Sequence, residues 1–193
     1  MRVIAGKFRS RNLQSLPGLA TRPTYDRLKE TLFNVLAAAG LVEGIVFVDL
    51  FAGTGSIGIE ALSRGASRAY FVESGRKAAQ VIRANLEALG VEGEAEVYDR
   101  TAAEGIRWLA ERGVRADVVF MDPPYKLQGA YSQVQRMIAS SGLLGTEGVL
   151  VAEHEKRFDP GDGELGLRRF RKLQQGDSVL SFYRLFTAQR ENA

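Results

Sequence analysis

From residue 45 onward, the chain alternates between two patterns of apolar residues. Short runs are apolar at consecutive positions, and longer stretches carry apolar residues every three or four positions. The short runs predict strands at 45–50, 69–73, 117–122 and 148–153. The segment 94–98, in which glutamate alternates with apolar residues, predicts another strand. The longer stretches predict helices at 56–65, 76–90, 102–113 and 130–139. Strands without a polar face that are separated by helices are typical of a parallel sheet covered on both sides, so we expect an α/β fold.

The two ends of the chain differ from this alternation. Residues 2–14 predict a small β-hairpin turned at Gly6-Lys7, and a connector rich in proline and glycine follows it. Residues 167–186 predict two strands around Gly176-Asp177, so we expect the sheet to end in an antiparallel hairpin. We therefore divide the chain into a basic N-terminal β-hairpin extension, 1–20, and a main α/β domain, 21–193.

A helix is expected directly after the connector. Leu28, Leu32, Val35 and Leu36 have the spacing of one apolar helical face, and Thr24 is placed to cap the first turn.

The composition is that of an ordinary globular protein. The 193 residues are 45% hydrophobic and 25% charged, and no cysteine is present to form a disulfide or a thiolate metal site. No run approaches the roughly 18 apolar residues of a membrane span, and the strand-like start does not resemble a signal peptide. His154 is the single histidine, and we expect it on the surface or behind the site, with no metal. We expect a cytoplasmic protein with no membrane association.

The charge is concentrated at the N-terminus. Residues 1–30 hold seven basic and two acidic side chains, a net +5, whereas the whole chain has a net charge of +3. A basic segment on a nearly neutral body indicates a polyanionic partner such as nucleic acid, although a solvated surface would carry the same charges. The candidate RNA-binding side chains are Arg2, Lys7, Arg9, Arg11, Arg22, Arg27 and Lys29.

A glycine-rich loop follows the first predicted strand. Its sequence, DLFAGTGSIGIEAL at 49–62, contains G-x-G-x-x-G, and Glu73 closes the next strand. A pyrophosphate on this loop would be repelled by Asp49, whereas a cationic ligand such as S-adenosylmethionine would be attracted. The candidate contacts are Asp49, Phe51, Gly53 and Gly55 for the methionine end, Glu73 for the ribose hydroxyls, Asp99 or Thr101 for the adenine amine, and Ala102 for the ring.

The fourth predicted strand ends in Asp122-Pro123-Pro124-Tyr125. The two prolines stiffen the turn and remove two N–H donors, so the Asp122 carboxylate and the Pro123 carbonyl remain as acceptors. Two acceptors suit a planar amine that must give up hydrogen bonds while its nitrogen attacks, and Tyr125 offers a face for stacking a base. We expect these four residues to be catalytic, although a rigid loop whose aspartate caps a helix would have the same sequence.

These motifs resemble those of a known family. Asp122-Pro123-Pro124-Tyr125 is similar to the motif of amino-directed nucleic acid methyltransferases. RPTYDRLKETLFNVL (22–36) together with the glycine loop resembles the RsmD family of 16S rRNA guanine-N2 methyltransferases. The resemblance implies a Rossmann-like class I methyltransferase with a mostly parallel seven-stranded sheet and S-adenosylmethionine as cofactor.

The same resemblance implies a substrate and its contacts. The substrate would be the guanine conventionally numbered 966 in 16S rRNA, within an assembled or partly assembled 30S subunit, and we expect a monomer. The resemblance places Arg22, Thr24, Arg27 and Lys29 near the mouth of the site. The family often carries an acid or amide where Thr101 precedes Ala102 here, which leaves the adenine contact open.

Three alternatives remain at this stage. An adenine-N6 or cytosine-N4 DNA methyltransferase would use the same catalytic motif, but the chain has no room for a separate DNA-recognition domain. A non-catalytic rRNA-binding assembly factor would have lost the cofactor loop or the acceptors, and both are present. An NAD-dependent oxidoreductase is disfavoured by Asp49. The basic run at 167–172 is either a second RNA contact or a charged strand edge.

Overall fold

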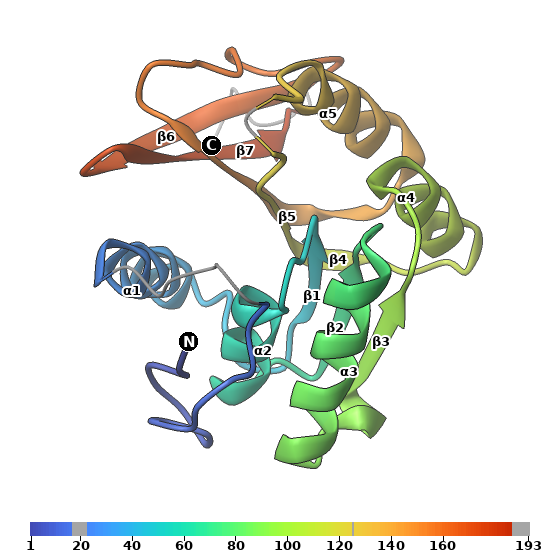
Figure 1. The fold of residues 1–193 in the computed structure, drawn as a ribbon. Helices are drawn as coiled ribbons and strands as arrows, with labels where there is room; N and C mark the ends of the chain where they lie inside the picture. Colours follow the sequence, from blue (N-terminus) through green and yellow to red (C-terminus); the bar gives the residue numbers. More distant parts are fainter. Residues whose placement is uncertain (17–22, 125, 187–193) are drawn as a thin grey trace.

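The computed structural model describes residues 1–16, 23–124 and 126–186. Seven strands form one sheet in the order β3-β2-β1-β4-β5-β7-β6 (Figure 1). The strands are β1 (Val46–Leu50), β2 (Arg68–Val72), β3 (Ala95–Tyr98), β4 (Ala116–Met121), β5 (Leu144–Glu155), β6 (Leu167–Gln175) and β7 (Ser178–Leu185). The first five are parallel and β7 is antiparallel to both of its neighbours, so the predicted mostly parallel α/β sheet is confirmed.

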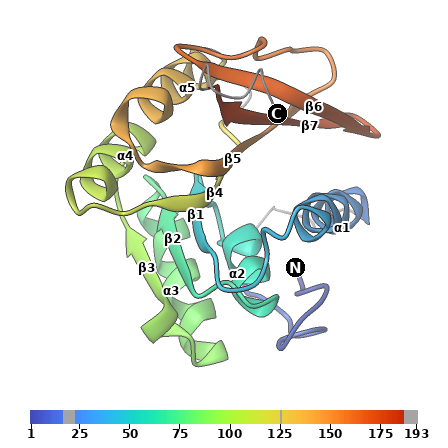
Figure 2. The same cartoon turned by 180° about the vertical axis from the view of Figure 1, so that it is seen from behind.

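Helices cover both faces of this sheet (Figures 1 and 2). They are α1 (Pro23–Ala38), α2 (Ser56–Ser63), α3 (Arg76–Leu89), α4 (Ala102–Glu111) and α5 (Gly129–Ser141), with a short 3₁₀ turn at Glu92–Glu94. One buried cluster joins α1, α2 and α3 to the face that carries Phe47 and Phe120, and the other joins α4 and α5 to the opposite face. The central strands β1 and β4 are therefore buried on both faces, which is why their sequences show apolar runs and not alternation.

The C-terminal hairpin makes β6 an edge strand. Two of its four basic residues form ion pairs within the molecule. Arg169 contacts Asp159 and Asp162 at 2.6 Å each, and Lys172 contacts Asp159 at 2.7 Å. These ion pairs favour the charged-edge interpretation of 167–172 over a second RNA contact.

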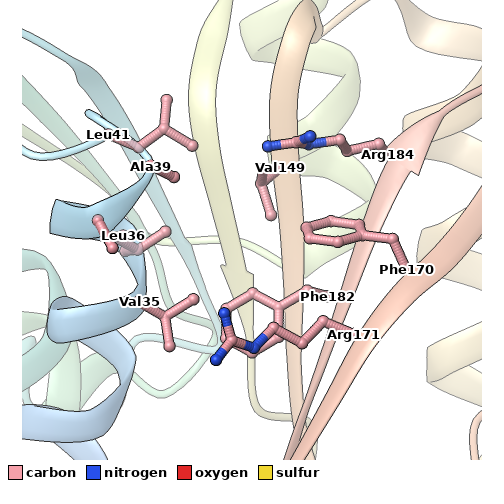
Figure 3. A pocket seen from close by; sticks show the side chains of 10 residues that line it. Val35, Leu36, Ala39, Leu41, Val149, Phe170, Arg171, Phe182 and Arg184 are labelled. Carbon is pink, nitrogen blue, oxygen red and sulfur yellow. The ribbon is translucent and has the colours of Figure 1, made fainter. Parts of the chain in front are cut away.

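A small hollow separates the hairpin from α1 (Figure 3). It has a volume of about 130 Å³, and Val35, Leu41 and Phe170 line it from α1, the following loop and β6. The guanidinium group of Arg184 lies 4.5 Å from the centre of the Phe170 ring. Val149 also lines the hollow and lies four residues before Glu153 in β5, so the hollow is separate from the carboxyl ends of the strands.

The N-terminal segment pairs with itself as the predicted small hairpin, although the pairing is short. One antiparallel bridge joins Arg2 to Asn12, and the Val3 N–H donates to the Arg11 carbonyl at 3.0 Å. Other backbone N–H groups of the segment bind α2. Ile4 and Ala5 donate to the Glu60 carboxylate at 2.8 and 3.0 Å, and Phe8 donates to the Ser63 hydroxyl at 3.0 Å. The proposed division between 1–20 and 21–193 falls in a segment outside the described residues.

Helix α1 begins one residue earlier than the cap that we predicted. Pro23 occupies the first helical position, where its fixed backbone angle is favourable and its missing N–H costs nothing. Thr24 therefore lies inside the first turn, so the prediction that it caps the helix is wrong. Within the described residues, no helix is both long enough and apolar enough to cross a membrane.

Candidate functional site

Three carboxyl groups lie together at the carboxyl ends of adjacent strands. Phe47 of β1, Phe120 of β4 and Val151 of β5 belong to the cluster beneath α1, α2 and α3. Asp49, Asp122 and Glu153 each follow one of these residues by two positions, so their side chains are directed to the same face. The β1–β4 and β4–β5 registers align the three strand ends. Ligands of open α/β sheets bind at this edge.

Asp49 is held at the start of α2. Its side chain is only 2% exposed, and its Oδ2 accepts a hydrogen bond from the Gly58 N–H at 2.9 Å. A Cβ atom at Gly58 would lie 2.4 Å from the Phe71 ring, so the third glycine of the loop allows α2 to approach β2 this closely. Burial raises the pKa of Asp49 to about 7, while the Gly58 hydrogen bond acts in the opposite direction. A cationic ligand would stabilise the carboxylate form.

Glu73 organises the loop that follows β1. Its Oε2 accepts the Gly53 N–H at 2.7 Å, and its Oε1 accepts the Gly75 N–H at 2.6 Å. A Cβ atom at Gly53, whose φ is +56°, would point into open space. The loop crest therefore presents bare backbone to a ligand, and each Glu73 oxygen retains a lone pair for a hydroxyl group.

A cavity of about 570 Å³ adjoins this loop. Phe51, Thr101 and Ala102 line it together with residues of α5, so the structure brings three of the predicted cofactor residues onto one surface. The Thr101 hydroxyl donates to Glu104 Oε2 at 2.6 Å and accepts from the Glu104 N–H at 3.3 Å, which forms the N-terminal cap of α4. Because its proton is used in this cap, Thr101 has a structural role that the sequence did not indicate.

Asp122 follows β4 directly and is half-buried. Burial raises the pKa of its carboxyl group to about 7. Pro123 is buried and Pro124 is exposed, and the Pro124 carbonyl accepts the Leu127 N–H at 2.7 Å. Tyr125 lies outside the described residues. The arrangement leaves the Asp122 carboxyl group as an acceptor beside a turn that lacks two N–H donors.

Two further residues of the site, Glu153 and Tyr25, were not predicted from the sequence. Burial, with the nearby charge of Asp122, raises the pKa of Glu153 to about 8. Burial also raises the pKa of Tyr25 in the first turn of α1, and the negative charges of Glu153, Asp122 and Asp49 raise it further. The signal for Glu153 was available, since it ends a predicted strand as Asp122 does.

We expect the ligand-free protein to lose stability as the pH rises from about 4.5 to 8. The pKa values of Asp49, Asp122 and Glu153 are raised to about 7, 7 and 8 in the folded protein. Between the ordinary value of about 4 and these values, the unfolded chain has released protons that the folded protein retains. Unfolding is therefore favoured by at most about 1.4 kcal/mol per pH unit for each group.

Urea unfolding measured at several pH values would test this dependence. Asp49→Asn, which removes one of the three groups, should reduce the slope. An identical slope in this variant would contradict the retained proton on Asp49.

The predicted RNA-binding residues fall into two groups. Arg2, Lys7, Arg9, Arg11 and Arg27 are exposed, while Arg22 and the side chain of Thr24 lie outside the described residues. Lys29 is 1% exposed and donates to the Arg2 carbonyl at 2.8 Å and to the Ser56 hydroxyl at 3.1 Å. An RNA phosphate cannot reach it, so the prediction for Lys29 is wrong.

The burial of Lys29 could have been predicted from its spacing along the helix. Lys29 precedes Leu32, Phe33 and Leu36 by three, four and seven positions and so lies on the buried face of α1.

The basic residues of the N-terminal segment 1–16, here called the arm, contact different elements. At the tip of the arm, the Lys7 N–H donates to the Ser63 carbonyl at the end of α2, and the Lys7 side chain forms an ion pair with Glu94 at 2.8 Å just before β3. Arg11 donates to the Ala88 carbonyl of α3 at 3.2 Å. Since α2 runs back from the carboxyl end of β1, this tip lies near the amino ends of the strands. The eight residues of α2 span about 12 Å, which separates Lys7 from the edge that holds Asp122.

His154 is buried in the sheet and not on the surface. It is 1% exposed, and its Nε2 lies 2.9 Å from the Ser181 hydroxyl in β7. Across the described parts of the chain, no group of three or more potential metal ligands is arranged to hold a metal ion.

Comparison with known proteins gives consistent matches over most of the chain. The sequence model of the family described as conserved hypothetical protein 95 matches residues 1–184. The Bacillus subtilis protein YlbH is 35% identical over 184 residues, which cover 95% of this chain and 98% of that protein. Ribosomal RNA small subunit methyltransferase D of Escherichia coli is 36% identical over 155 residues, which cover 80% of this chain and 75% of that protein.

Solved structures share the fold. The yhhF protein of Escherichia coli superposes with a TM-score of 0.82 at 28% identity and covers 96% of this chain and 98% of its own. An RNA methyltransferase from Salinibacter ruber, in complex with S-adenosyl-L-homocysteine, superposes with a TM-score of 0.65 at 16% identity. The match covers 90% of this chain and 98% of that protein. This second likeness concerns the fold alone.

Proposed function

The chain belongs to the RsmD family, whose sequence model is described as conserved hypothetical protein 95, and from this premise we propose its reaction. It transfers a methyl group from S-adenosylmethionine to the exocyclic N2 amine of a guanine in 16S rRNA, at the position conventionally numbered 966. The observation that carries the proposal is the half-buried Asp122 carboxyl group, which precedes two prolines and lies one strand from the buried Asp49.

The residues at the loop fit the proposed cofactor. Asp49 is a buried acid with one oxygen on Gly58, so its other oxygen can accept from a cationic amino group. The bare crest at Gly53 and the two oxygens of Glu73 suit a ligand that carries hydroxyl groups and approaches the backbone closely. When bound, S-adenosylmethionine supplies an electrophilic methyl group on a sulfonium.

Asp122 and Pro123 orient the amine. The lone pair of an exocyclic amine is delocalised into its ring, so the amine is a poor nucleophile. The Asp122 carboxylate and the Pro123 carbonyl each accept one N–H, which draws the nitrogen toward tetrahedral geometry and aligns its lone pair. Because burial raises the pKa of Asp122 to about 7, its carboxylate can also take the proton that the nitrogen loses.

Transfer of a labelled methyl group to three substrates tests the proposal. The purified protein is incubated with labelled S-adenosylmethionine and 30S particles, naked 16S rRNA or duplex DNA. We expect label in 30S particles that carry an unmethylated target, and mass spectrometry should locate it as N2-methylguanosine. Label in duplex DNA alone would indicate a DNA methyltransferase. Absence of both transfer and cofactor binding would indicate an assembly factor.

The arm gives a separate prediction about RNA affinity. We expect the combined change of Lys7, Arg9 and Arg11 to Gln to weaken binding to the RNA substrate and to lower its salt dependence. The slope of log K against log salt should fall by up to about 0.9 for each phosphate contact that is lost. Binding measured at several salt concentrations gives this slope.

Point changes are preferable to deleting the arm. Val3 and Leu13 are 1% and 5% exposed, so their removal would open the core. A matched control changes Arg112, Arg115 and Arg136 to Gln, because these residues are exposed on the α4 and α5 side. Equal salt slopes in the two triple variants would show that the arm is not a phosphate contact.

A further inference from the structure

Glu153 is a buried acid with an incomplete set of hydrogen bonds. It lies near the carboxyl end of β5 and is only 6% exposed. Its Oε2 atom has no hydrogen-bond partner among the described residues. A buried acceptor without a hydrogen-bond partner destabilises the folded protein. Its presence at a site therefore indicates a ligand that supplies the missing donor.

The position of Glu153 places this acceptor beside Asp122. Met121 of β4 pairs with Ala152 of β5, so the next residues, Asp122 and Glu153, stand side by side on neighbouring strands. Neighbouring strands lie about 4.8 Å apart, and both side chains are directed to the face beneath α1. The charge of Asp122 contributes to the raised pKa of Glu153, which agrees with this proximity.

The bases with exocyclic amines differ at the atom next to the amine. In guanine, N1–H is a donor beside the N2 amine. In adenine and cytosine, the ring nitrogen beside the amine is an acceptor. Asp122 accepts from the amine, and a second carboxylate beside it can therefore accept the N1–H of guanine. The same carboxylate would repel the lone pair on the ring nitrogen of adenine or cytosine.

We propose, resting on the function proposed above, that Glu153 selects guanine by accepting its N1–H while Asp122 accepts from its N2 amine. Glu153 is thus a specificity-determining residue, and the two carboxyl groups read adjacent donors on one edge of the base. Burial makes the Glu153 carboxylate costly to form, and the N1–H donor offsets this cost only when guanine is bound.

A substrate with a changed atom at N1 tests the assignment. Reconstituted small-subunit particles carry either guanine or 2-aminopurine at the methylated position, which is first located by mass spectrometry. 2-Aminopurine keeps the amine that receives the methyl group but has a lone pair at N1. For the wild-type protein, we expect kcat/KM to be at least on the order of 10²-fold higher for guanine.

Glu153→Gln should narrow this ratio by at least about tenfold, because the amide can turn an N–H toward the N1 lone pair. 2-Aminopurine also lacks O6, but this loss affects both proteins and cancels when the ratios are compared. Glu155→Gln is a matched control, since Glu155 lies two residues further along the same strand and is exposed. Its ratio should equal that of the wild-type protein.

Two results would overturn the assignment, and neither affects the proposed reaction. One is wild-type kcat/KM values that are equal for the two bases. The other is an unchanged ratio in Glu153→Gln. If Glu153→Gln does not fold, Glu153→Met, which keeps the length of the side chain without an acceptor, takes its place and should narrow the same ratio. No methylation of guanine by the wild-type protein would instead refute the proposed function, and the selection of guanine with it.

Discussion

Asp122→Ala should lower kcat on the order of 10²- to 10³-fold while the affinity for S-adenosylmethionine changes little. The methyl side chain cannot accept a hydrogen bond, so the amine loses one of the two acceptors that draw its nitrogen out of the plane of the ring. The cofactor loop, by contrast, is held by Asp49 and Glu73 through their own contacts with Gly58, Gly53 and Gly75.

Single-turnover kinetics and calorimetry with S-adenosylmethionine would separate these two effects. Asp122→Asn is the matched control, because its amide oxygen still accepts a hydrogen bond and its volume is the same. We expect it to retain much more activity than Asp122→Ala. Losses of rate and of cofactor affinity that are equal in size would contradict a role at the target amine.

Glu60→Ala should reduce the free energy of unfolding by about 3–5 kcal/mol. Glu60 is fully buried in α2, and its carboxylate lies 2.8 Å from Arg64 Nε and 3.4 Å from Lys29 Nζ. The same carboxylate accepts the Ile4 and Ala5 N–H groups. Its removal leaves the Lys29 charge without its carboxylate partner and releases the arm from α2.

Urea unfolding followed by circular dichroism measures this loss. Glu94→Ala is a suitable control, because Glu94 also pairs with the arm, through Lys7, but both side chains are more than 40% exposed. An exposed pair contributes only about 0–1 kcal/mol. If the two variants lose equal stability, the buried carboxylate does not anchor the arm.

The order of strands and helices was predictable from the sequence, because burial of a parallel sheet on both faces leaves apolar runs at the strands. The cofactor loop and the acids at the strand ends were predictable for a related reason. Asp49 and Asp122 each interrupt an apolar run at its carboxyl end, and such ends meet at one edge of the sheet.

The contacts of the N-terminal arm and of α1 with distant parts of the chain were harder to predict. Lys7 and Lys29 are equally basic in the sequence, but Lys7 is exposed at the tip of the arm and Lys29 is buried against Glu60. The backbone of the arm bonds to the Glu60 and Ser63 side chains, which lie more than 50 residues away in the chain. No local pattern indicates such a partner, so the sequence predicted the short antiparallel pairing within the arm but not its attachment to α2.

The sequence by itself determined the alternation of strands and helices, the position of the glycine loop and the acids at the ends of β1 and β4. These features depend on neighbouring residues and on the burial of the sheet. Only the tertiary structure decided which distant groups pair with the charged side chains, as Lys29 does with Glu60 of α2. It also decided that Glu153 stands beside Asp122, since the register between β4 and β5 joins positions 31 residues apart. Side-chain burial and strand pairing are properties of the whole packed molecule and are not written in any one segment.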